Sequence, residues 1–276
     1  MTIKLSLLSL FILFLFNFKA IADFSSAMST LKKIKKSDQK IIDKARDCLP
    51  TEKNNIYDFC TGAQIENVQS FTSMSLQECI GTIGNRNYKT IYTNKNLDIS
   101  AQEFDSFINS KKRAETFHDV KVVVFREGVS NRIDCLHELI HVYQWTSESK
   151  NVLSPPLRLK HLEKIEIALN LAVAEVEKSE KAKKIQEAQK YSIQISPYID
   201  FLRQWSDMTD WLDEKDAHFF IFSHCAQLQC SLTDLDVATA NLVKRKSYLP
   251  KSFYPELDRV GIEVLTKLKH HSVNEK

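Results

Sequence analysis

The chain has 276 residues, of which 43% are hydrophobic and 26% are charged, and its formal net charge is +3. These values indicate a globular protein, long enough for one large domain or two small ones with a proper core. A charge this close to zero gives no electrostatic reason to expect an anionic membrane as a partner, and we expect no nucleic-acid partner.

The amino terminus has the pattern of a secretory signal peptide. Lys4 precedes an apolar run at 5–16, and Ala20-Ile21-Ala22 places small residues before a potential cut. The run is too short to span a bilayer comfortably. Residues 1–22 are therefore predicted to be a signal peptide cleaved after Ala22, and the mature protein to be secreted or periplasmic without stable membrane insertion.

Local patterns predict several elements before residue 130. Apolar spacing among lysines over 25–49 predicts one or two amphipathic helices, and G-T-I-G-N-R-N at 81–87 indicates a turn. The segments 88–92 and 120–125, the latter V-K-V-V-V-F, favour strands, and a capping box predicts a short helix at 100–110 between them.

After Pro155-Pro156 the pattern becomes that of long helices. A helix or helix pair is predicted at 157–193, and Ser196-Pro197 is expected to open the next helical segment. Two more helices are expected near 234–244 and 255–269.

The stretch R-I-D-C-L-H-E-L-I-H-V-Y-Q-W at 132–145 contains the most informative motif, H-E-x-x-H. On a helix, His137 and His141 project from one face, where a single zinc ion could take a nitrogen from each. Glu138 would then lie beside the metal as a general base. The alternative is a pair of hydrogen-bonded core histidines.

The surroundings of the motif favour a helix. Ser130 or Asn131 can cap it, and Asp134 falls in its first turn, where a negative charge suits the helix dipole. Cys135 points roughly away from His137, so it is interpreted as a disulfide partner or a buried thiol and not as a ligand.

Six cysteines follow the signal peptide: Cys48, Cys60, Cys79, Cys135, Cys225 and Cys230. An even number in an oxidising compartment favours disulfide bonds, although the sequence does not select their pairing. We therefore expect disulfides in the mature protein.

The motif His137-Glu138-Leu139-Ile140-His141 resembles that of the zincin metallopeptidases, and H-E-L-I-H-V-Y-Q is similar to helices of gluzincin-type families. The resemblance covers this helix, the strand before it and, less closely, a later helix. It implies that a sheet edge beside the site pairs with extended substrate backbone. The segment 120–125 could be that edge or a buried inner strand.

A catalytic zinc ion needs a third protein ligand. The metzincin spacing is absent, because position 144 is Gln and no suitable histidine follows. Glu214 is predicted to be the ligand, on an apolar helical stripe with Ala217 after it. A surface carboxylate is the competing interpretation, and His218 is the alternative ligand.

The sequence of the later helix resembles Glu-x-x-Ala of the gluzincins, but the fuller family pattern would have Asp where this chain has His218. The residue that orients the zinc histidines is therefore unassigned among three candidates: Asp210, Asp213 and Asp216. The donor to the reaction's oxyanion is equally open, with these candidates: His218, His224, Tyr143, Tyr191 and Tyr198.

The sequence thus predicts an α+β, predominantly α-helical protein with a zincin-like core, a small sheet before the motif helix and a helical C-terminal half. Residues 23–276 would form one domain, with an α+β part at 23–154 and a helical part at 155–276. The predicted function is hydrolysis of a peptide or protein substrate with Zn²⁺. The alternative is a non-catalytic zincin-like binding or structural module.

Overall fold

The computed structural model describes residues 24–47, 60–61, 65, 67–93, 104–146, 153–231, 233–234, 237 and 240–241. Within them the protein is mostly helical with one three-stranded sheet, which confirms the predominantly helical α+β class. The predicted signal peptide, Cys48 and the helix expected at 255–269 lie outside the described residues, as does most of 234–244.

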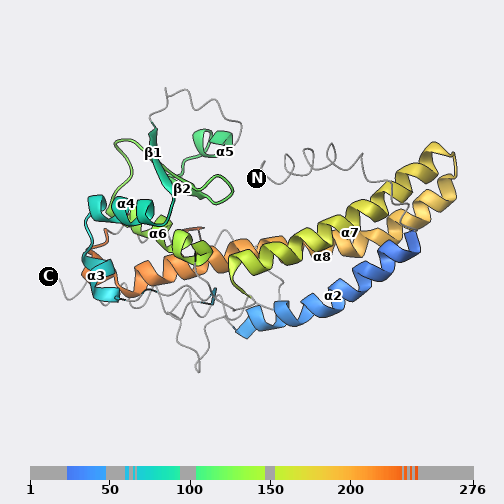
Figure 1. Ribbon diagram of the computed structural model, residues 1–276, viewed down its shortest axis with the longest axis horizontal. Helices are drawn as coiled ribbons and strands as arrows, with labels where there is room; N and C mark the ends of the chain where they lie inside the picture. Colours follow the sequence, from blue (N-terminus) through green and yellow to red (C-terminus); the bar gives the residue numbers. More distant parts are fainter. Residues whose placement is uncertain are drawn as a thin grey trace.

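Three long helices, α2 (Phe24–Asp47), α7 (Pro155–Lys181) and α8 (Ile185–Ser223), lie side by side as an elongated bundle (Figure 1). Each turns an apolar stripe toward a common core, to which Leu31 and Trp205 belong. The shorter elements gather at one end of the bundle: α3 (Val68–Ser73), α4 (Leu76–Asn85), α5 (Asp105–Ile108), α6 (Arg132–Thr146) and α9 (Cys225–Leu228).

The expected start of a new helix at Pro197 is wrong, because α8 continues through this proline. Proline removes a hydrogen bond to the carbonyl four residues earlier, here that of Ile193. Ile193 is 74% exposed, so water can donate to that carbonyl, while Ile195 and Tyr198 are buried in the bundle. The chain turns earlier, where Lys183 has a left-handed φ of 59°.

The sheet has the order β1-β3-β2, and β3 pairs parallel with β1 and antiparallel with β2. β1 (Lys89–Thr93) and β3 (Val122–Arg126) confirm the two predicted strands. β2 (Ala114–Phe117) was not predicted, because A-E-T-F has no alternation of polar and apolar residues. β3 is thus the inner strand and β2 an edge.

The two faces of β3 contact different helices. Val123 and Phe125 belong to one apolar cluster with α4 and α6, whereas Val122 and Val124 pack with the α5 residue Phe107. Burial on both faces accounts for the uninterrupted run of valines. The sheet therefore presents one face to the motif helix.

Helix α4 replaces the turn that was expected at 81–87. Ser75 and Glu78 form a capping box at its start, and the helix buries Cys79 and Ile83. The turn follows the helix, at Asn87, which has a left-handed φ of 64°.

Two disulfide bonds confirm the expectation from the cysteine count. Cys79–Cys135 joins α4 to α6, and Cys225–Cys230 closes a short loop after α8. Cys135 is therefore a disulfide partner and not a buried thiol, which were its two predicted roles. None of the helices in the described part of the chain combines the length and the apolarity needed to cross a membrane.

Candidate metal centre

Helix α6 begins at a hydrogen-bonded cap. Asn131 Oδ1 accepts from the backbone N–H groups of Ile133 at 2.8 Å and Asp134 at 3.1 Å. The Asn131 N–H donates in return to the Asp134 carboxylate at 2.7 Å. Asn131 is thus the cap of the two candidates, while the Ser130 hydroxyl accepts from the Arg126 N–H at 2.8 Å.

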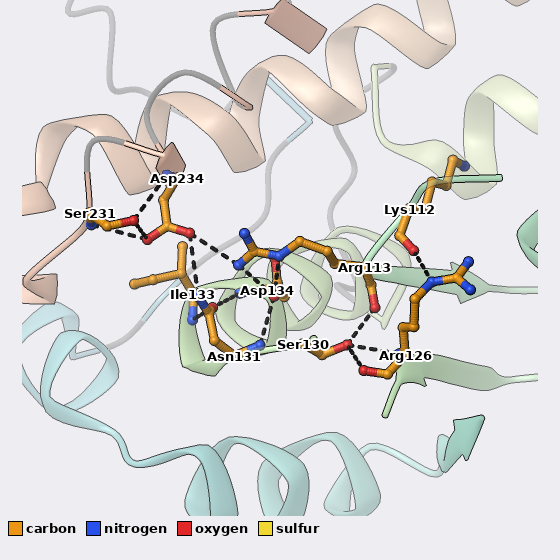
Figure 2. A network of polar contacts seen from close by, with 9 residues as sticks. All are labelled: Lys112, Arg113, Arg126, Ser130, Asn131, Ile133, Asp134, Ser231 and Asp234. Atoms are coloured by element: carbon orange, nitrogen blue, oxygen red, sulfur yellow. Dashed lines mark hydrogen bonds and ion pairs between the residues drawn. The ribbon is translucent and has the colours of Figure 1, made fainter. Parts of the chain in front are cut away.

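Arg113, just before β2, connects the start of α6 to the C-terminal segment. Figure 2 shows its guanidinium between Asp134 and Asp234, at N···O distances of 2.8 and 3.0 Å. Asp234 also accepts from the N–H and the hydroxyl of Ser231. These groups are mostly buried, so salt screens them less than a surface pair. The network fixes β2 against α6.

His137 and His141 lie one turn apart on α6 and face Glu214 on α8. Their Nε2 atoms are 3.1 Å apart, and His137 Nε2 is 3.4 Å from Glu214 Oε2. The three potential ligand atoms all lie within 4.8 Å of one another. The structure thus brings together the three residues predicted as ligands.

These separations fit the ligands of one metal ion. With zinc–ligand bonds of about 2.0–2.1 Å, the ligand atoms of a tetrahedral site are about 3.3–3.4 Å apart. The two distances from His137 Nε2, 3.1 Å to His141 Nε2 and 3.4 Å to Glu214 Oε2, are close to that value. Two imidazoles and a carboxylate also offer three donors to a divalent cation, so the group could hold a metal ion.

The electrostatic surroundings of the two histidines differ. Burial and the nearby His218 lower the pKa of His137, although Glu214 opposes them, and this favours the neutral, ligating imidazole. Burial also acts to lower the pKa of His141, but the carboxylates of Glu214 and Glu138 outweigh it and raise that pKa. Because a metal ion binds the deprotonated imidazole nitrogen, its binding would compete with protonation of His141.

Gln144 orients His141, a role that was not predicted from the sequence. His141 Nδ1 donates to Gln144 Oε1 at 2.8 Å, and Gln144 Nε2 donates to the Asp213 carbonyl at 3.0 Å. These two hydrogen bonds join α6 to α8. They also hold the His141 ring so that Nε2 faces Glu214. The available signal was a polar residue on the apolar stripe, three positions after His141.

None of the three aspartates named as candidate partners of the zinc histidines bonds to them directly through its carboxylate. Asp213 reaches His141 only through its carbonyl and Gln144, while its carboxylate pairs with the buried Arg158. Burial raises the pKa of Asp213 to about 6 although Arg158 opposes this. Asp216 accepts from the Thr61 N–H and hydroxyl, and Asp210 lies on the exposed side of α8.

Glu138 is buried at 6% exposure, and its Oε2 accepts from Thr116 Oγ1 at 2.6 Å. Thr116 belongs to β2, so the edge strand contacts the candidate base directly. The other carboxylate oxygen, Oε1, has no hydrogen-bond partner in the described part of the chain. Thr116 thus fixes Oε2, while Oε1 is available to accept a proton.

His218 lies beside the cluster, unlike the tyrosines proposed as donors. Its Nε2 is 3.2 Å from Glu214 Oε2, without a hydrogen bond to any described residue. The Tyr143 ring lies 3.7 Å from the Arg86 guanidinium on another side of α6. The remaining candidates pack in other places: Tyr191 and Tyr198 in the helical bundle, and His224 against Phe220.

No protein-family model, curated protein or solved structure matches this chain. Inference about its function therefore rests on its own residues.

Proposed function

We propose that the protein is an exported zinc-dependent metallopeptidase of the zincin type. The observation that carries this proposal is the meeting of the H-E-x-x-H histidines with Glu214, while the buried Glu138 accepts a hydrogen bond from Thr116 of β2. His137, His141 and Glu214 would hold the ion, which leaves a fourth position open. When bound, zinc would polarise the substrate carbonyl as a Lewis acid and lower the pKa of a water molecule, so that hydroxide is available as the nucleophile at neutral pH.

The chain's own residues move the proton. Glu138 accepts a proton from the attacking water and returns it to the leaving amine, the two steps of general base and general acid catalysis. Thr116 donates to Oε2 at 2.6 Å, so Oε1 is the oxygen that carries the proton. Burial beneath the sheet keeps bulk water from competing for this carboxylate.

The edge strand β2 supplies a surface for a peptide or protein substrate. Within the described residues, β2 pairs only with β3, so the backbone groups along its outer edge can pair with an extended peptide. Because Thr116 of the same strand contacts Glu138, a peptide on this edge would lie next to the base.

The test compares wild type with Glu138→Gln, which keeps the size of the side chain but cannot accept the proton. Both proteins should contain equal zinc by mass spectrometry, and only wild type should hydrolyse a mixed library of fluorogenic peptides. Hydrolysis by the variant at the wild-type rate would show that Glu138 is not the base. Zinc-loaded wild type that cleaves none of the peptides would contradict the proposed activity.

A non-catalytic zinc-binding module is the second candidate, and His218 favours it. Its buried Nε2 lacks a hydrogen bond among the described residues and lies next to Glu214, so it could close the site as a fourth ligand. X-ray absorption of the zinc-loaded protein separates the two. Four protein ligands, with one lost in His218→Ala, would support the module, whereas three protein ligands and an oxygen from solvent support the peptidase.

A further inference from the structure

His118, directly after β2, lies along the same face of α6 as the candidate base. Thr116 belongs to β2, and His118 begins the turn that follows this strand. Thr116 contacts Glu138, and the His118 ring stacks on Trp145 with centroids 4.3 Å apart. The end of β2 therefore follows α6 from Glu138 to Trp145.

The place of Trp145 brings His118 close to the metal ligands. Trp145 follows His141 by four residues, so the two side chains are neighbours on the helix surface. The electrostatic influence of His141 reaches His118 as well, where it adds to burial in lowering the pKa. His118 thus lies beside the metal group but takes no part in the proton transfer by Glu138.

A hydrogen bond from Tyr88 sets the tautomer of His118. The Tyr88 hydroxyl lies 3.0 Å from His118 Nδ1, and burial raises the pKa of Tyr88 to about 12, so the phenol keeps its proton. Nδ1 is the single hydrogen-bond partner of this hydroxyl among the described residues, and a buried hydroxyl satisfies its proton by donating it. The proton of the neutral imidazole is then on Nε2.

Burial keeps His118 neutral near pH 7, because its pKa lies well below the usual value. Its Nε2–H has no hydrogen-bond acceptor among the described residues. The chain therefore holds, beside the metal group, an oriented N–H donor that lacks a partner within the described protein.

We propose that His118 Nε2–H donates a hydrogen bond to the carbonyl oxygen of the peptide bond under attack, with Tyr88 as the residue that positions it. This inference rests on the proposed peptidase function and assigns the donor that the tyrosines do not provide. A preorganised donor is most effective where negative charge develops on that oxygen, and removing one typically costs about 10²- to 10³-fold in kcat.

His118→Phe tests the assignment, because phenylalanine keeps an aromatic ring on Trp145 but has no N–H. The probe is a set of N-phosphoryl dipeptides, whose anionic tetrahedral group imitates the charge on the attacked carbonyl. Calorimetry on the zinc-loaded proteins should show binding weakened about 10- to 100-fold, as expected for a lost hydrogen bond to a charged group. Tyr143→Phe, which removes a hydroxyl beside Arg86, is the matched control and should bind like wild type.

The outcomes separate this inference from the function on which it rests. Unchanged probe binding by His118→Phe, with zinc content and wild-type binding intact, would overturn the role of His118 alone. Zinc-loaded wild type that binds none of the probes would overturn both. Nitrogen-15 NMR of labelled histidine gives a readout independent of activity: wild type should carry the proton on Nε2, and a proton on Nδ1 would refute the assignment.

Discussion

Gln144→Leu should weaken metal binding without touching any predicted ligand. The glutamine is completely buried and joins His141 Nδ1 to the carbonyl of Asp213. Leucine has nearly the same volume but neither accepts nor donates a hydrogen bond. The ring of His141 then loses the contact that fixes its orientation toward Glu214.

The magnitude follows from the two bonds that are lost. Removing a partner that orients a metal-bound histidine typically costs about 10- to 100-fold in metal affinity. A buried polar group left without a partner costs about 1–3 kcal/mol of stability, and here the His141 N–H loses its partner, whereas the Asp213 carbonyl keeps its hydrogen bond within α8. We therefore expect a weaker zinc site and a lower Tm of the metal-free protein.

The assay is competition with a chromophoric chelator at fixed pH, which gives the zinc Kd, together with thermal unfolding of the metal-free protein. Gln194→Leu, an exposed substitution on α8, is the control and should leave both quantities unchanged. Gln144→Glu should fall between, since a carboxylate still accepts from His141 but cannot donate to the carbonyl of Asp213. A zinc Kd of Gln144→Leu within about twofold of wild type would refute the orienting role.

Three further expectations concern other parts of the chain. Glu214→Ala should lose most of its zinc by mass spectrometry while Asp210→Ala keeps it, and equal zinc content in the two would move the third ligand elsewhere. His118 has a depressed pKa, so the unfolded chain binds its proton more readily: stability is complete above about pH 6.5 and falls as the pH is lowered through that value. Denaturant unfolding of the metal-free protein at about pH 7.5 and about pH 5 should show a smaller pH-dependent loss in His118→Phe, and equal losses would count against a buried neutral imidazole. N-terminal sequencing of the exported protein should begin at Asp23, and a chain that begins at Met1 would contradict the predicted cleavage.

Local patterns in the sequence were enough to find the elements that carry the candidate site. The helix with His137 and His141, the strands near 89–93 and 122–126 and the amphipathic helix α2 all follow from spacing and propensity within a few residues. The even number of cysteines likewise predicted disulfides, since this depends on composition and compartment alone.

Sequence spacing could favour Glu214 as a ligand but could not place it 3.4 Å from His137, because that distance depends on how α8 packs against α6. The edge strand β2 has no recognisable pattern of its own and exists through pairing with β3. Pro197 remains within a helix because its neighbours are buried in the bundle.

Only the tertiary structure determines the contacts that orient the side chains of the candidate site. Gln144 on α6 reaches Asp213 on α8, and Thr116 on β2 reaches Glu138, so each bond joins elements that are distant in the sequence. Such bonds depend on two backbones being placed within a few tenths of an ångström. That placement results from the packing of whole apolar clusters, a sum over many residues that no local pattern contains.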